Sequence, residues 1–299
     1  MNTRITTRVH AIAAAAACLI LPATGIAGDD IDRTLKMSSD GLVRVENMAG
    51  SIEFTGWDRD EVQVRGEAGN DVEEVEITSN SSGVQIRVRN PKGENRVDGT
   101  NLYLRLPKTA SIEAESVSAD ISASRSSGES VILTTVSGDL VADVSPQRLE
   151  LTSVSGDIEQ EGSASRATVE TVSGDITLVG PSGEISVSTV SGDVSMEGGE
   201  VERGRFESVS GELVLSMALV DGGRVNCDSM SGDVSLRLPE SQQADFGAQS
   251  FSGDIHTDFG EAVSVSRGPG TYLEHRSGDN GATIRIESFS GDISIRSVD

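Results

Sequence analysis

A short unit, Ser-Gly-Asp with an apolar residue on each side, recurs from residue 117 onward and constrains the fold more than any other feature. Its acidic position returns every 18 to 21 residues, with one final interval of 38 that predicts a degenerate copy within it. Repeats of this length are typical of stacked architectures. The acidic positions are Asp120, Asp139, Asp157, Asp175, Asp193, Glu212, Asp233, Asp254 and Asp292.

The residues around each acid form aligned columns. The positions eight and six before the acid are mostly apolar, the position four before it is always Ser or Thr, and the positions between are mostly polar. A period of two predicts a strand with one buried face. We expect the glycine to supply a backbone conformation that other residues resist, and Ser and Asp to bond the local backbone. A second break is predicted near Gly162, Gly180 and Gly198.

One period is too short to close its own core, so neighbouring periods must stack through parallel ladders about 4.8 Å apart. We therefore predict an all-β fold, a parallel β-solenoid of about 18–21-residue coils over residues 111–299. An antiparallel sandwich also gives many short strands, but the nearly fixed period favours coils. Residues 28–110 alternate without Ser-Gly-Asp and predict a β-strand region that caps the solenoid. Met48 to Ile52 is a candidate diverged corner.

The first 27 residues have the pattern of a signal peptide. Arg4 and Arg8 precede an apolar run too short to span a bilayer, and small residues end at Ala27, where we expect cleavage. Lipidation at Cys18 is the alternative. The sequence thus predicts an exported chain, periplasmic or at the cell surface, with no transmembrane segment after cleavage.

Charge narrows the possible partners. The chain has 48 Asp and Glu against 24 Lys and Arg, a net charge of −24, so nucleic acid and anionic lipid would be repelled. Cys227 falls in a buried column and is predicted to be inert. Trp57, Tyr103 and Tyr272, which are far apart in sequence, are predicted to pack in the cap or in loops rather than to bind sugar.

Two chemical alternatives remain open. The acidic column could bind Ca²⁺, which prefers carboxylate and carbonyl oxygens, although each Asp bonding its own turn is the simpler interpretation. Some β-helices cleave polysaccharides with carboxylates in a groove, and His256, predicted to point outward, or His275 could assist an acid. We predict no catalytic, cofactor-binding or metal-binding residues, and no cofactor.

The serial Val-Ser-Gly-Asp-Ile units resemble a bacterial β-strand-repeat family of unknown function, often labelled "putative adhesin". Gly56-Trp57-Asp58 and the segment from Ser231 to Pro239 are also similar to that family. The resemblance covers nearly all of the chain beyond residue 27 and brings no catalytic or cofactor residues. Together the observations predict a non-enzymatic structural or interaction protein of the cell envelope. Its partner would be an envelope or extracellular protein or glycan, not nucleic acid.

Overall fold

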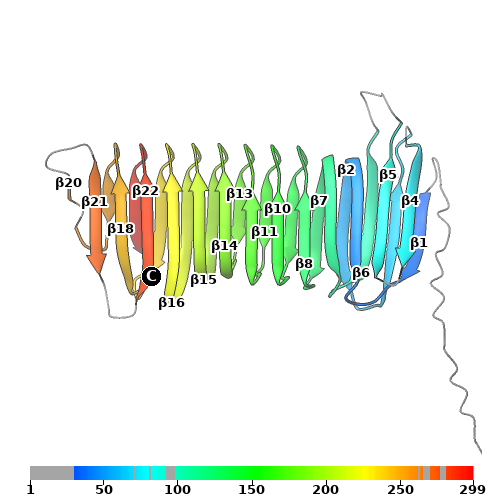
Figure 1. Cartoon of the computed structure of the whole chain (residues 1–299), viewed down its shortest axis with the longest axis horizontal. Helices are drawn as coiled ribbons and strands as arrows, with labels where there is room; N and C mark the ends of the chain where they lie inside the picture. Colours follow the sequence, from blue (N-terminus) through cyan, green and yellow to red (C-terminus); the bar gives the residue numbers. More distant parts are fainter. Residues whose placement is uncertain are drawn as a thin grey trace, which may run out of the picture.

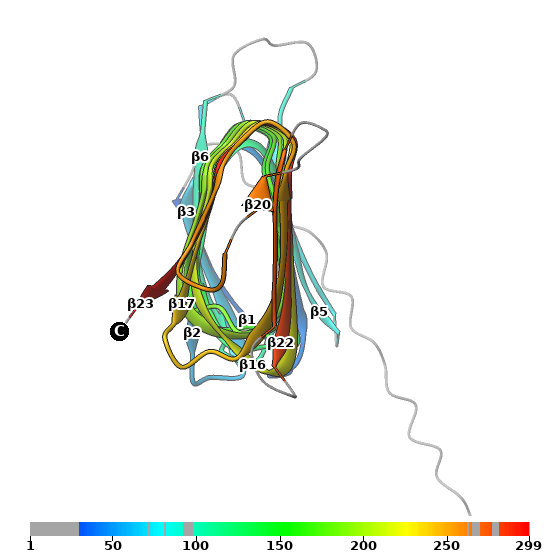
Figure 2. The ribbon, with the colours of Figure 1, turned by 90° about the vertical axis from the view of Figure 1, so that its left-hand side faces the viewer.

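The computed structural model describes residues 30–70, 72–80, 82–91, 98–261, 263–264, 270–276 and 281–298. These residues form 23 strands, and no helix among them is long and apolar enough to cross a membrane. The predicted signal peptide, residues 1–27 with Cys18, lies outside the described residues. Figure 1 shows the strands side by side in one long stack, and Figure 2 shows that stack end-on as a flattened ring.

The ring has two long sides, which we call face A and face B, and the long strands pass from one to the other. Face A contains, in spatial order, β4 (Glu74–Asn80), β5 (Gly83–Arg89), the first halves of β2 (Leu42–Trp57) and β7 (Ser111–Ser126), β8 (Ser130–Thr134), β10 (Arg148–Thr152), β12 (Arg166–Glu170), β14 (Gly183–Thr189), the second halves of β15 (Val194–Ser208) and β16 (Leu213–Ser229), β22 (Ala282–Ser288), β18 (Ala244–Ser250), β21 (Thr271–Arg276) and β20 (Val263–Ser264).

Face B contains the complementary strands. In spatial order these are β1 (Asp30–Lys36), β3 (Glu61–Glu67), β6 (Thr100–Pro107), the second halves of β2 and β7, β9 (Leu140–Val144), β11 (Ile158–Glu161), β13 (Ile176–Val179), the first halves of β15 and β16, β17 (Val234–Pro239), β23 (Ile293–Val298) and β19 (Ile255–Thr257).

Neighbouring coils pair in parallel, residue on like residue. On face A, Arg148 lies opposite Ser130 on one side and Arg166 on the other, and on face B, Ile158 lies between Leu140 and Ile176. Repeat columns therefore become straight rows along the stack. The prediction of an all-β, solenoid-like fold is confirmed.

The core is one continuous hydrophobic cluster between the two faces. Alternate residues of each strand point into it, as Leu149 and Leu151 of β10 do with about 1% or less of their surface exposed. Small aliphatic side chains fill most coils, and Phe54 and Phe206 are the largest fully buried residues. The predicted alternation of buried and outward positions is confirmed. Gly162, Gly180 and Gly198 have φ of 103°, 67° and 76° at the return from face B to face A, so the predicted second break is also present.

At the N-terminal end, β2 forms a complete coil. It pairs in parallel with β7, with Asn47 opposite Ser116 and Ile52 opposite Ile121, so residues 48–52 occupy a repeat corner as expected. On its other side β2 pairs with β5 and β6, which come later in the chain. The first coil in sequence is therefore not the first in space. A division between a cap region and a repeat region at residue 110 stays a prediction.

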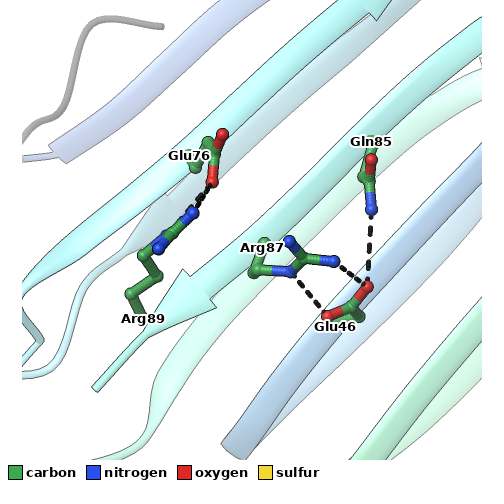
Figure 3. A network of polar contacts seen from close by, with 5 residues as sticks. All are labelled: Glu46, Glu76, Gln85, Arg87 and Arg89. Atoms are coloured by element: carbon green, nitrogen blue, oxygen red, sulfur yellow. Dashed lines mark hydrogen bonds and ion pairs between the residues drawn. The ribbon is translucent and has the colours of Figure 1, made fainter. Parts of the chain in front are cut away.

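Antiparallel strands close this end of the stack, with β4 on β5 and β1 on β3. Ion pairs on the outer side of face A link the closing strands to the first coil (Figure 3): Arg87 donates two hydrogen bonds of 2.7 Å to Glu46 of β2, and Arg89 pairs with Glu76 of β4. The Arg87 hydrogen bonds hold the pKa of Glu46 below its ordinary value. Three strands are thus joined by side chains as well as by their backbones.

The C-terminal end is also out of sequence order. The last coil, β22 with β23, lies between β16–β17 and β18–β19. The degenerate copy expected between Asp254 and Asp292 is replaced, in the described part of that segment, by β20 and β21. β21 runs antiparallel to β18 and ends face A. The long interval in the repeat is a closing hairpin followed by the return of the chain into the stack.

Candidate functional site

The Ser-Gly-Asp units form a corner at which every coil turns from face A to face B. Each corner begins with the Ser or Thr four residues before the acid. In the Thr171 corner, for example, the hydroxyl is buried and accepts a hydrogen bond of 3.1 Å from the N–H of Gly174, three residues on. Equivalent bonds occur in the other corners, which explains why that column contains only Ser or Thr. The hydroxyl replaces a backbone partner that the turn removes.

The Ser and Asp of the unit bond the neighbouring coil rather than their own turn. Ser173 Oγ donates to the carbonyl of Val154 over 3.3 Å, and the N–H of Asp175 donates to Oδ1 of Asp157 over 2.8 Å. The same carboxylate ladder continues through most corners, with lengths of 2.8–3.0 Å. The expectation that each Asp bonds its own turn is therefore wrong, because the stacked N–H lies directly in front of the carboxylate.

The corner position requires glycine because there is no room there for a side chain. The corner glycines Gly138, Gly156, Gly174 and Gly192 are absent from the positive-φ residues, so the expected unusual backbone conformation is not the reason for them. A Cβ at Gly174 would lie 2.0 Å from the carbonyl oxygen of Gly156, and one at Gly192 would lie 1.8 Å from that of Gly174. Glycine permits the corners of successive coils to approach this closely.

Of the two apolar residues that flank the unit, one is buried and the other is exposed. The residue after the acid, such as Ile176, is buried, whereas the residue before Ser-Gly, such as Val172, is 44% exposed. These exposed residues form one row along the corner edge, which we call the apolar ridge. In spatial order the apolar ridge comprises Met48, Val117, Val136, Val154, Val172, Val190, Val209, Met230, Phe289 and Phe251, each 41–59% exposed.

The ridge becomes larger and more aromatic towards the C-terminal end. Phe251 and Phe289 stack with their ring centroids 5.0 Å apart, a contact that exists because the last coil is inserted beside β18. A groove of about 810 Å³ lies along this part of the ridge, which we call the C-terminal groove. Its apolar wall is the ridge from Val190 to Phe251, its floor is the buried row of corner hydroxyls, and its other wall includes Glu207, Asp228 and Glu287.

Other residues singled out in the sequence lie elsewhere. Cys227 is fully buried, which confirms the predicted position in the core, and burial raises the pKa of its thiol. His256 is exposed as predicted. Tyr103 and Tyr272 are 49% and 42% exposed, so the prediction that they are packed is wrong. Trp57 is half-buried, its Nε1 donating to the carbonyl of Glu61 over 2.9 Å.

Among the described residues, the groove is lined by no acid–histidine pair, because neither His256 nor His275 lies in its walls. Within the described part of the chain, no group of three or more His, Cys, Asp or Glu side chains is placed to hold a metal ion. The expectation of no catalytic, cofactor-binding or metal-binding residue stays a prediction.

The ridge was missed from the sequence, although its signal is present there. Positions eight, six and four before the acid point inward, so position three before it has the opposite parity and must point outward. An apolar residue at an outward position in every repeat is the pattern that predicts an exposed apolar row.

Comparisons with known proteins identify the class of protein. A family model, Toastrack DUF4097, matches residues 42–296, and the chain therefore belongs to this family of unknown function. The resemblance to an adhesin-labelled family of unknown function is confirmed at that level. A search of functionally curated proteins found no match.

Solved structures show a similar fold. A "putative adhesin" from Parabacteroides merdae matches with a TM-score of 0.53 at 9% identity, over 90% of this chain and 97% of that one. A "putative adhesin" from Bacteroides fragilis matches with a TM-score of 0.36 at 12% identity, over 90% and 97% of the two chains. At such low identity the Parabacteroides merdae structure supports the fold alone, and the Bacteroides fragilis match carries no further argument.

Proposed function

We propose that this chain is an exported, non-enzymatic interaction protein of the bacterial cell envelope, adhesin-like in its action. It acts by presentation: a rigid stack displays one apolar ridge beside the row of corner carboxylates. The single observation that carries the proposal is that ridge, in which an apolar side chain stays exposed at every corner. A contiguous exposed apolar row on an otherwise polar surface marks an interaction site.

Repetition explains how such a surface could bind without a deep pocket. Each coil offers the same small site about 4.8 Å from the next, so a partner that reaches several coils gains avidity from contacts that are weak one by one. The net charge becomes −26 if residues 1–27 with Arg4 and Arg8 are removed. Such a negative charge favours a partner with positive charge. Residues 28–110 would serve as the cap that covers one end of the stack.

Export is tested by fractionating cells that express the full chain and sequencing the N-terminus of the product. We expect a mature chain that begins at Gly28 and lies outside the cytoplasm. A cytoplasmic product that retains Met1 to Ala27 would contradict the proposal at this first step.

Binding is tested with the mature chain and envelope fragments. The variant replaces four exposed ridge residues, Val136, Val154, Val172 and Val190, by Thr, which keeps the β-branched shape of the side chain and removes its apolar end. The control replaces Val141 and Val179 by Thr. These two residues are 43% and 42% exposed on face B, away from the ridge. We expect weaker binding by the ridge variant only, at equal melting temperature. Equal binding by both variants would contradict a role of the ridge.

A further inference from the structure

The C-terminal groove differs from the rest of the ridge in having two unlike walls. One wall is apolar and includes Met230, Phe289 and Phe251; the other carries Glu207, Asp228 and Glu287. Each coil contributes one residue to each wall. The residue five before the acid points outward into one wall, the residue three before it points outward into the other, and the buried hydroxyl lies between them. A ligand in this groove therefore meets carboxylates along one side and aliphatic or aromatic groups along the other.

Charge selects among the possible occupants. Glu207 is already paired with Arg205 of the same strand, whose pKa Asp228 also raises from further away. Within the part of the chain that the structure describes, Asp228 and Glu287 form no ion pair of their own and are the carboxylates offered to a ligand. The exposed corner row of Glu212, Asp233, Asp292 and Asp254 lies just beyond the apolar wall. A second copy of this acidic chain or an anionic membrane would bring like charges together. The groove is complementary to a cationic ligand with an apolar side.

Spacing selects the form of that ligand. The apolar wall spans five coils, from Val190 to Phe251, which is about 19 Å at about 4.8 Å per coil. An α-helix lying along the groove presents one side chain per turn every 5.4 Å or so and drifts from the coils by about 2.4 Å over that length. Alternate side chains of an extended strand are about 6.7 Å apart and drift by about 8 Å. A helix stays in step with the coils, and a strand does not.

We propose that the C-terminal groove binds a cationic amphipathic α-helix of a partner protein, of about 13 residues along the contact. Its apolar side chains contact Met230, Phe289 and Phe251, and its Lys or Arg residues on one flank face Asp228 and Glu287. This mode places an amphipathic helix in a hydrophobic groove. The inference rests on the proposed function and specifies the partner class at one end of the ridge.

The test uses the mature chain and three synthetic peptides of about 18 residues, long enough to form a helix on binding. The first has Leu on one helical face and Lys on the other, the second has Glu in place of Lys, and the third has the composition of the first in scrambled order. Affinity is measured by fluorescence anisotropy at low and at physiological salt. We expect binding of the first peptide only, with helix formation seen by circular dichroism and with weaker binding at higher salt.

Two variants locate the site. Phe289→Thr with Met230→Thr removes the centre of the apolar wall, and Asp228→Asn with Glu287→Gln removes the offered charges. We expect each pair to weaken binding about tenfold or more. The matched controls are Val141→Thr with Val179→Thr, and Glu159→Gln with Glu161→Gln, which are exposed on face B and should leave the affinity unchanged. Thermal unfolding of each variant confirms that it is folded.

The outcomes separate this inference from the proposed function. Equal binding of the scrambled peptide, or equal loss in variants and controls, overturns the helix inference. So does a dimer that sedimentation detects and that Phe289→Thr with Met230→Thr dissolves. If ridge-dependent envelope binding persists in any of these cases, the proposed function stands without it. If groove binding is found but envelope binding does not depend on the ridge, the proposed function fails instead.

Discussion

At the residue scale, each position of the repeat corner has a separate physical task. The Ser or Thr satisfies the N–H of the glycine, the apolar residue stays exposed, the serine bonds the preceding coil, the acid bonds the following one, and the glycine permits close stacking. Only part of this was predictable. The columns and the turn followed from the sequence alone, but the glycine and the Asp act between coils, on contacts that a single repeat does not reveal.

The glycine assignment can be tested by contrast. Gly174→Ala should destabilise the protein by about 3 kcal/mol, because its Cβ would meet backbone at 2.0 Å that cannot move without shifting a coil. Gly180→Ala should cost only about 1 kcal/mol, from its positive φ of 67°, since nothing lies within 4 Å of its Cβ. Urea unfolding monitored by circular dichroism measures both. A larger loss for Gly180→Ala would contradict the close-approach explanation.

The carboxylate ladder makes a second prediction. Asp157→Ala should lower the free energy of unfolding by about 1 kcal/mol, because the N–H of Asp175 loses its acceptor. Asp157→Asn keeps an oxygen in place and should be nearly neutral.

The same ladder makes a prediction about calcium. Since one oxygen of each such carboxylate already accepts a hydrogen bond, we expect Ca²⁺ to raise the melting temperature no more than Mg²⁺ does at equal ionic strength. A large shift specific to Ca²⁺ would restore the calcium-binding alternative.

At the element scale, strands were predictable and their neighbours at the two ends were not. Every coil presents the same columns, so β22 and β23 find the same register beside β16–β17 as any other coil would. The alternating pattern therefore fixes which side of a strand is buried but not which coil lies next to it. Both ends show this freedom: β2 and the last coil each lie one position inside the stack. Antiparallel strands cover the N-terminal end on both faces and the C-terminal end on face A.

The Glu46–Arg87 pair at the N-terminal end gives a pH-dependent prediction (Figure 3). The folded-state pKa of Glu46 is lowered by Arg87, so its contribution to stability is present above the unfolded pKa and is lost as the pH falls through the folded one. Glu46→Gln should therefore lower the melting temperature more at about pH 7 than at about pH 3. Glu53→Gln, at an exposed position of the same strand, is the control. A loss for Glu46→Gln that is equal at both pH values would contradict this assignment.

At the scale of the whole molecule, identical stacking converts a sequence repeat into a surface. Because the corners lie in register from Met48 to Phe251, ten separate residues become one apolar ridge beside the row of corner carboxylates. The alternation of inward and outward positions in the sequence predicts that these residues are exposed. That they form one ridge follows only from their neighbours in the stack. The inserted last coil adds the stacked Phe pair that the order of the chain would have separated.

Thiol accessibility across one corner decides whether the apolar ridge is exposed. Val172→Cys and Ile176→Cys are made separately in the mature chain, where buried Cys227, whose pKa is raised, serves as the internal reference. A thiol reagent should label Val172→Cys at the rate of a free cysteine, and label Ile176→Cys and Cys227 only on unfolding. Equal or reversed labelling of the two engineered positions would mean that the apolar residue before Ser-Gly is not exposed, and the ridge with everything inferred from it would be wrong.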